Sequence, residues 1–214
     1  MAKVGADLVL LDASRGEYMC VPQGASTLSL DPDSDAIAAP DAEAGRKLQQ
    51  AGFAIWTADH AGAPRRPPPA LPTRDLPERS DVATTLQDLR DVAWAYGAMT
   101  WCYRGRSFGA IVAQAQRLAD ARGRHDLNMI DIDRDVKVFR RWLPWAPFQG
   151  ECLVRSFMLL LFLHRRGRGA AWVFGVRTWP FSAHCWLQVD DTVLDDHSGH
   201  LAGYMPIMAI TPRS

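Results

Sequence analysis

The spacing of hydrophobic and polar positions first indicates a small unit of short strands in the N-terminal part of the chain. Apolar runs at residues 8–11 and 18–21 flank the turn Ser14-Arg15-Gly16 and predict a hairpin. Residues 26–30 alternate polar and apolar side chains and predict a third strand, while residues 41–51 have the spacing of a helix. Three strands and one helix bury little surface, so we expect this unit to pack on a larger one or on a ligand.

From about residue 80 the apolar positions recur at helical spacing, and strand patterns follow. The expected helices cover residues 80–103, 108–121, 131–143 and 151–166. The expected strands cover residues 170–177, 184–189 and 192–194, and the turn Asp190-Asp191 joins the last two. Helices followed by an antiparallel meander predict an α+β fold.

A proline-rich stretch separates the two patterns. Residues 62–72 read GAPRRPPPALP, and their five prolines remove backbone donors and favour an extended polyproline conformation. We therefore expect a semi-rigid linker at residues 62–79, between an N-terminal unit at 1–61 and a larger domain at 80–214. The alternative is that the prolines form a ligand motif for another protein.

Composition and charge narrow the class of protein. Hydrophobic residues make up 48% of the 214 positions, which is ordinary for a globular protein, and 24 basic side chains balance 24 acidic ones. This balance gives no support to a nucleic-acid or membrane-surface partner. The most apolar run, residues 157–163, falls far short of the roughly 20 residues that cross a bilayer, and no secretory signal pattern is present. We expect a cytoplasmic protein.

One of the four cysteines stands where a reactive thiol is expected. In the cytoplasm Cys20, Cys102, Cys152 and Cys185 are expected as thiols rather than as a disulfide framework. Cys152 begins the predicted helix at 151–166, where unpaired backbone N–H groups and the helix dipole stabilise a thiolate. Cys152 is therefore the candidate nucleophile. Cys20 and Cys102 are expected in the core.

Two further residues complete a candidate triad. His184 opens a predicted strand and can serve as base and then as acid near neutral pH. Asp196 lies at the end of the next strand, and a hairpin brings the end of its second strand beside the start of its first. Asp196 would then orient the imidazole. The Cys152 backbone N–H and the Gln149 side chain are candidate oxyanion donors. Cys185 should face the other side of its strand and serve packing.

A metal site is the alternative use of the same residues. Cys152, His184, His197 and His200 could supply ligands, but the His197-x-x-His200 pair lies in a glycine-containing loop and lacks a paired cysteine motif. We therefore expect no metal and no other cofactor, while stimulation by ATP stays open.

The segment around these residues resembles the C-terminal domain of lasso peptide maturation B proteins, which are transglutaminase-like cysteine proteases. The matching elements are CLVRS at 152–156, RRG at 165–167, VFGVR at 173–177, AHCW at 183–186 and VLDD at 193–196. The resemblance covers residues 131–210 and implies that Cys152, His184 and Asp196 are the catalytic triad. Cys185 departs from the family pattern, where a small residue is usual, and Asp195 stands where another polar residue is usual.

The N-terminal unit resembles the recognition element of the same systems, a small winged-helix-like unit. In such elements the leader of a precursor peptide adds a strand to a three-stranded sheet, against the last helix. This resemblance implies leader-binding positions on one strand and one helix. They are Ser26, Leu28 and Leu30 on the strand and Lys47 and Leu48 on the helix.

Together the resemblances imply a leader peptidase. Such a protein binds the leader of a ribosomal lasso-peptide precursor and cuts it from the core, and a partner cyclase resembling asparagine synthetase then closes the core with ATP. Two alternatives stay open. One is acyl transfer or transamidation on the same triad, which shares the thioester. The other is a non-catalytic peptide-binding chaperone.

Overall fold

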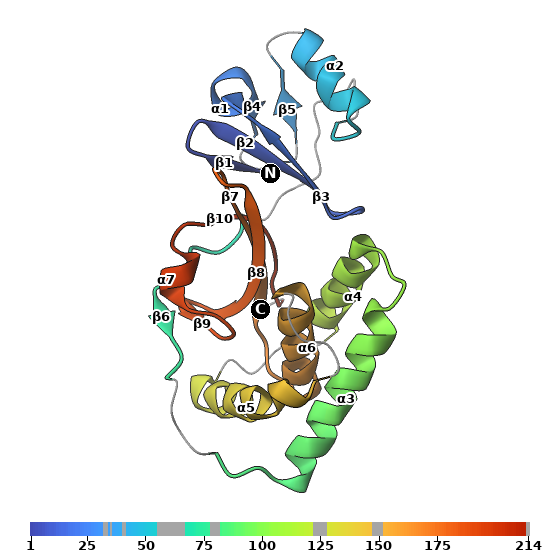
Figure 1. The fold of residues 1–214 in the computed structure, drawn as a ribbon, viewed down its shortest axis with the longest axis vertical. Coiled ribbons are helices and arrows are strands. Elements are labelled where there is room, and N and C mark those ends of the chain that lie inside the picture. Colours follow the sequence, from blue (N-terminus) through green and yellow to red (C-terminus); the bar gives the residue numbers. More distant parts are fainter. Residues whose placement is uncertain are drawn as a thin grey trace.

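A computed structural model gives the fold and describes residues 1–31, 34, 36–39, 42–54, 67–77, 82–121, 128–146 and 152–212. A three-stranded sheet lies at the N-terminal end of the molecule, a five-stranded sheet occupies the middle, and a group of helices lies at the other end (Figure 1). The α+β class expected from the sequence is confirmed.

The elements follow the chain in two groups. The first holds β1 (Ala2–Val4), β2 (Asp7–Asp12), β3 (Glu17–Val21), α1 (Gly24–Thr27), β4 (Ser29–Leu30), β5 (Ile37–Ala38) and α2 (Ala42–Gln50). The second holds β6 (Arg74–Asp75), α3 (Leu86–Tyr103), α4 (Phe108–Asp120), α5 (Met129–Trp142), the 3₁₀ turn η1 (Leu143–Trp145), α6 (Cys152–Arg165), β7 (Ala171–Arg177), β8 (Ser182–Val189), β9 (Thr192–Val193), α7 (Ser198–Leu201) and β10 (Met205–Ile210).

The N-terminal sheet contains the predicted hairpin but a different third strand. Strands β2 and β3 pair antiparallel as expected, and β1 completes the order β1-β2-β3. The prediction of a third strand in residues 26–30 is wrong for this sheet. Gln23 adopts a left-handed φ of 56°, a helical turn follows, and only Ser29–Leu30 extends, to pair with β5 in a separate two-stranded sheet.

Both faces of the N-terminal sheet are covered. Side chains alternate along β2, so Leu8 and Leu10 enter a small core with α2, while Val9 and Leu11 enter the main core of the larger domain. At the hairpin turn the Gly109 N–H of α4 donates to the Ser14 carbonyl at 3.2 Å. A Cβ at position 109 would lie 2.8 Å from that oxygen, so this close approach requires glycine. The N-terminal unit therefore rests directly on the larger domain.

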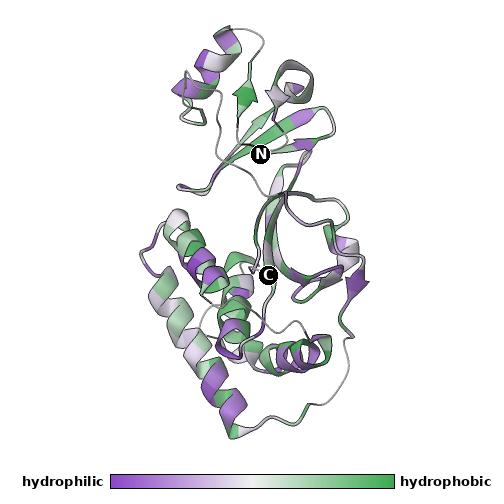
Figure 2. Ribbon diagram, turned by 180° about the vertical axis from the view of Figure 1, so that it is seen from behind, coloured by the Kyte–Doolittle hydropathy of each residue, from purple (hydrophilic) through white to green (hydrophobic). Residues whose placement is uncertain are grey.

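Helix α6 is the centre of the larger domain. Every residue from Phe157 to Leu163 is buried, because α3 and α5 pack on its sides and strand β8 packs across it. Figure 2 shows hydrophilic residues on the outer helices α3 and α5. The sheet beside α6 has the order β10-β7-β8-β9-β6. In the described part of the chain, no helix has the length and apolar character needed to cross a membrane.

Part of the expected linker forms an edge of this sheet. Strand β6 pairs parallel with β9, and the N–H groups of Thr73 and Arg74 donate to the Asp191 carbonyl at 2.9 and 3.0 Å. The Gln188 side chain donates to the Ala70 carbonyl at 3.0 Å, and Leu76 is buried. Residues 67–77 are thus fixed along the larger domain, while residues 62–66 and 78–79 of the expected linker lie outside the described residues.

A buried ion cluster fixes the end of α6 to α3 and α5. The cluster joins Asp88, Asp91 and Asp135 to Arg134, Arg165, Arg166 and Arg168. Asp88 is 1% exposed and accepts from Arg166 at 2.8 Å and from Arg134 at 2.9 Å. The same carboxylate accepts from the Thr85 N–H at the start of α3. The Asp88 side chain thus joins α3 to α5 and to the end of α6, and it also takes part in the capping of α3.

Replacing Asp88 tests this cluster. We expect Asp88→Ala to lower the free energy of unfolding by about 3 kcal/mol, because two arginines lose a buried partner and α3 loses one of the two bonds of its capping box. Urea denaturation measures the change. The control is Glu43→Ala, which removes an ion pair whose two side chains are 72% and 69% exposed and should leave stability nearly unchanged. Equal losses for both variants would contradict the prediction.

Candidate active site

Helix α6 begins at Cys152, so the thiol stands at a helix N-terminus as the sequence predicted. The side chain is partly buried against the main core. Free N–H groups of the first helical turn surround this position and favour negative charge on the sulfur. Gln149 lies outside the described residues, so its role as an oxyanion donor stays a prediction.

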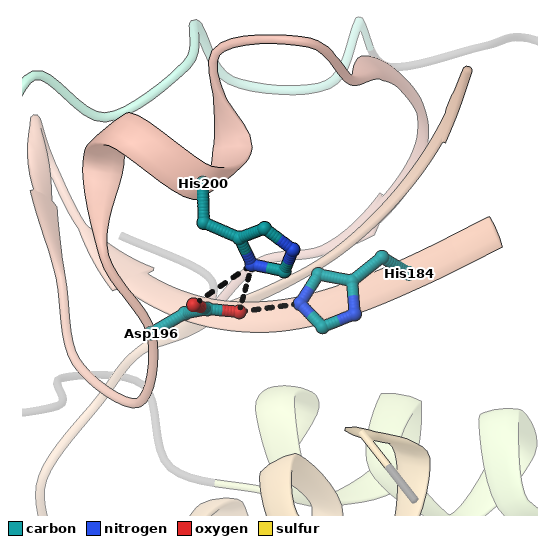
Figure 3. A group of neighbouring side chains, drawn as sticks. All are labelled: His184, Asp196 and His200. Carbon is teal, nitrogen blue, oxygen red and sulfur yellow. Dashed lines mark hydrogen bonds and ion pairs between the residues drawn. The ribbon is translucent and has the colours of Figure 1, made fainter. Parts of the chain in front are cut away.

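The structure brings His184 and Asp196 together. Strand β8 carries His184, and β9 pairs with β8 through Gln188 and Val193. The Leu194 N–H extends this pairing to the Leu187 carbonyl at 2.8 Å, which carries the chain back toward the start of β8. As a result His184 Nε2 lies 2.5 Å from Asp196 Oδ2 (Figure 3).

The Cys152 thiol and the His184 ring shift each other's pKa toward the charged forms. Hydrogen bonds from the Cys185 side chain, the His184 ring and the Cys185 N–H lower the pKa of Cys152 to about 4. Burial opposes the charge on His184, but hydrogen bonds with Asp196 and Cys152 raise the pKa of its imidazole to about 9. At neutral pH the pair is therefore a thiolate and an imidazolium, the reactive state of a thiol nucleophile.

Asp196 is held as a carboxylate by several donors. Burial would raise its pKa, yet the hydrogen bonds from His184, the His197 N–H and His200 lower it well below the usual range. His200 Nδ1 lies 3.1 and 3.2 Å from the two carboxylate oxygens, and Arg155 Nη2 lies 3.8 Å away. Figure 3 shows the two imidazoles approaching this carboxylate from different elements. The sequence contained one signal for His200, its position four residues after Asp196.

The same residues are the candidate ligands for a metal. Among the described residues, His184, Asp196 and His200 form the single group of three whose ligand atoms all lie within 4.8 Å of one another. Neither Cys152 nor His197, which the sequence grouped with them, belongs to it. The three side chains already satisfy one another by hydrogen bonds. The absence of a cofactor stays a prediction.

A cavity of about 220 Å³ opens beside Asp196. Arg140, Arg155 and His197 line it from three elements, and Asp195 lies at its wall. Asp195 accepts from the Leu187 N–H at 2.8 Å, and burial raises its pKa to about 6. The cavity thus reaches Asp196, whereas neither Cys152 nor His184 lines it.

Cys185 lies closer to the nucleophile than the sequence suggested. It points to the opposite face of β8 from His184, as expected, but that face meets the start of α6. Its thiol and its backbone N–H both lower the pKa of the Cys152 thiol, and its Sγ lies 3.3 Å from Ser156 Oγ, one helical turn after Cys152. Cys185 is therefore buried in the core as predicted, but the part of the core that it enters adjoins Cys152. Strand alternation could not say which element covers that face.

The N-terminal unit also reaches the site. The Tyr18 ring on β3 lies 5.9 Å from Phe181, which precedes His184 on the β7–β8 hairpin. Burial and the nearby thiols of Cys185 and Cys152 raise the pKa of Tyr18 to about 12. On the same hairpin Trp179 Nε1 donates to Asp7 Oδ2 at 2.6 Å. The sequence held no signal for these contacts, because they join segments far apart along the chain.

The five expected leader-binding residues do not form one exposed strand edge. Leu28 and Leu48 are buried together in the small core. Ser26 lies in the helical turn α1, and Leu30 pairs through its backbone with Ile37. Lys47 lies on α2, exposed, 2.7 Å from Glu43. Among the described strands, both β1 and β3 are edges of the three-stranded sheet; β1 also contacts β10 and β7 of the larger sheet, so β3 is the edge that lies away from that sheet.

A thiolate at a helix N-terminus, an imidazolium and an orienting carboxylate together define a cysteine–histidine–aspartate site on an α+β fold. The sequence pattern of the Transglutaminase-like superfamily matches residues 93–209, and the chain belongs to that superfamily. Over 49 residues the chain is 41% identical to the Microcin J25-processing protein McjB of Escherichia coli. This match spans 23% of the chain and 24% of that relative. No solved structure matches the chain.

Selective alkylation tests the state of the Cys152 thiol. At pH 6 we expect iodoacetamide to modify Cys152 well before Cys20, because Cys152 is already a thiolate while burial raises the pKa of Cys20. Mass spectrometry of the digested protein reads each cysteine separately. In urea the two residues should react at similar rates. Equal rates in the folded protein would contradict a thiolate at Cys152.

Proposed function

We propose that the protein is a cytoplasmic thiol peptidase that cuts the leader from a ribosomal lasso-peptide precursor. The observation that carries the proposal is the arrangement of the Cys152 thiol at the start of α6, the His184 ring that raises its reactivity and the Asp196 carboxylate bonded to that ring. Membership of the superfamily and the partial similarity to a microcin-processing protein support it. On this proposal residues 1–61 form the unit that recognises the leader, and residues 80–214 form the peptidase domain. Residues 62–79 connect the two.

The reaction follows from the charges of the site. The Cys152 thiolate attacks the carbonyl carbon of the scissile bond, and the Cys152 N–H stabilises the developing oxyanion. His184 Nε2 is bonded to Asp196, so Nδ1 is left to protonate the departing amine. His184 then takes a proton from water, the hydroxide attacks the thioester, and the leader leaves with a free carboxyl group. The core keeps its amine for a partner cyclase.

Strand addition at β3 is the proposed mode of leader binding. The edge of β3 offers backbone groups that a peptide can pair with, which gives affinity with little dependence on sequence. Tyr18 on β3 packs on Phe181, three residues before His184, so a bound peptide would lie close to the nucleophile. The position of β3 thus favours a peptide substrate over the small acyl acceptors of a transferase.

Removal of the nucleophile separates binding from cleavage. We expect Cys152→Ala to abolish cleavage of a candidate precursor, a fall of about 10³-fold or more, because no other group can form the thioester. Leader binding, measured by fluorescence anisotropy, should persist. Cys102→Ala, which removes a cysteine from helix α3, is the control and should cleave normally. Cleavage by Cys152→Ala would reject the peptidase, and an amide at the leader end in mass spectra would indicate acyl transfer.

The pH profile tests the ion pair. We expect kcat/KM to rise as the pH passes about 4, where Cys152 loses its proton, and to fall as it passes about 9, where His184 does. Asp196→Asn should lower the rate by about a hundredfold and move the upper limb to lower pH, because the imidazolium loses its carboxylate. Asp190→Asn, at a left-handed turn position that asparagine tolerates, is the control. If the fall of kcat/KM at high pH stayed at the same pH in Asp196→Asn, the role of Asp196 would be contradicted.

A further inference from the structure

We propose that Cys185 is a positioning residue for the nucleophile, and that its thiol donates a hydrogen bond to Cys152 whenever the Cys152 sulfur is negatively charged. This inference deepens the proposed function and rests on it for the role of Cys152. It assigns a task to the residue that departs from the small side chain usual in the resembling family.

Cys185 is placed so that it keeps its proton. The side chain is 2% exposed and lies in the main core, on the face of β8 that packs against α6. Burial and the neighbouring Cys152 sulfur raise the pKa of the Cys185 thiol well above its usual value. The two cysteines therefore divide the roles, since Cys152 is the anion and Cys185 the thiol with a hydrogen to donate.

The contacts of Ser156 show which acceptors are available to the hydrogen of the Cys185 thiol. The Ser156 hydroxyl lies 2.7 Å from the Cys152 carbonyl, which only accepts, so its hydrogen is used there. Trp172 Nε1 donates to the same hydroxyl oxygen at 2.8 Å. The 3.3 Å contact between Ser156 Oγ and Cys185 Sγ is then one in which the thiol donates. Cys185 thus has two acceptors, the Ser156 hydroxyl and the Cys152 sulfur.

The charge on Cys152 decides between these acceptors. When Cys152 is neutral or acylated, the Cys185 hydrogen bonds to Ser156. When Cys152 is a thiolate, a hydrogen bond to the charge is stronger, so the Cys185 hydrogen turns to it. The stabilisation is therefore confined to the two states that carry the charge, the attacking thiolate and the thiolate that leaves the thioester. The Cys185 N–H, which also lowers the pKa of Cys152, adds a donor that cannot turn away.

The test is the pH dependence of Cys152 alkylation in three variants, with the Cys152 peptide followed by mass spectrometry. Loss of one hydrogen bond to a charged group should move the midpoint up by about one pH unit in Cys185→Ala and in Cys185→Val. Cys185→Ser keeps a donor and should stay near the wild-type midpoint. The valine variant retains volume and covers the case in which the alanine variant fails to fold.

The controls separate hydrogen bonding from packing. Leu187→Val removes a methylene from the same face of β8 and should leave the midpoint unchanged. The proposal is overturned if alanine and valine leave the midpoint in place, or if serine moves it as far as alanine does. Alkylation needs no substrate, so these outcomes are independent of the peptidase assay. A shifted midpoint in a protein that cleaves no precursor would reject the peptidase and keep the positioning role.

Discussion

The packing of α6 against β8 is the constraint on which the site depends. The helix is buried along its length and its last turn is tied by arginines to buried aspartates of α3 and α5, so its direction is fixed. A helix fixed in this way presents its first residue at one place on the sheet. That residue is Cys152, and the place is the start of β8, where His184 and Cys185 leave the strand on opposite faces.

The electrostatics of the site follow from burial that is only partial. A thiolate, an imidazolium and a carboxylate lie in sequence, so each charge has an opposite neighbour on at least one side. Asp196 stays ionised although it is nearly buried, because its carboxylate accepts hydrogen bonds from His184, His197 and His200. Asp195, one residue earlier, has a single hydrogen-bond donor and a raised pKa. The two adjacent carboxyl groups thus have pKa values shifted in opposite directions, because they differ in burial and in the number of donors that they meet.

The sequence predicted local features and strand pairings better than it predicted contacts between distant segments. The helix at Cys152 and the β2–β3 hairpin were predictable because apolar period and turn residues act over a few positions. The approach of Asp196 to His184 was predictable because a hairpin fixes its own register. The place of Cys185 beside Cys152, and of Tyr18 near the site, depends on which elements cover each strand face. Periodicity carries no information on that choice.

The covered faces of the N-terminal sheet change how recognition and cleavage are coupled. A flexible tether would raise the local concentration of substrate but leave the spacing between leader and scissile bond free. Here Val9 and Tyr18 enter the core of the larger domain, and Gly109 bonds the hairpin turn, so the unit is fixed rather than tethered. A peptide paired along β3 would then reach Cys152 after a set number of residues. On the proposed function, the packing of the two units would therefore fix the distance between the bound leader and the bond that is cut.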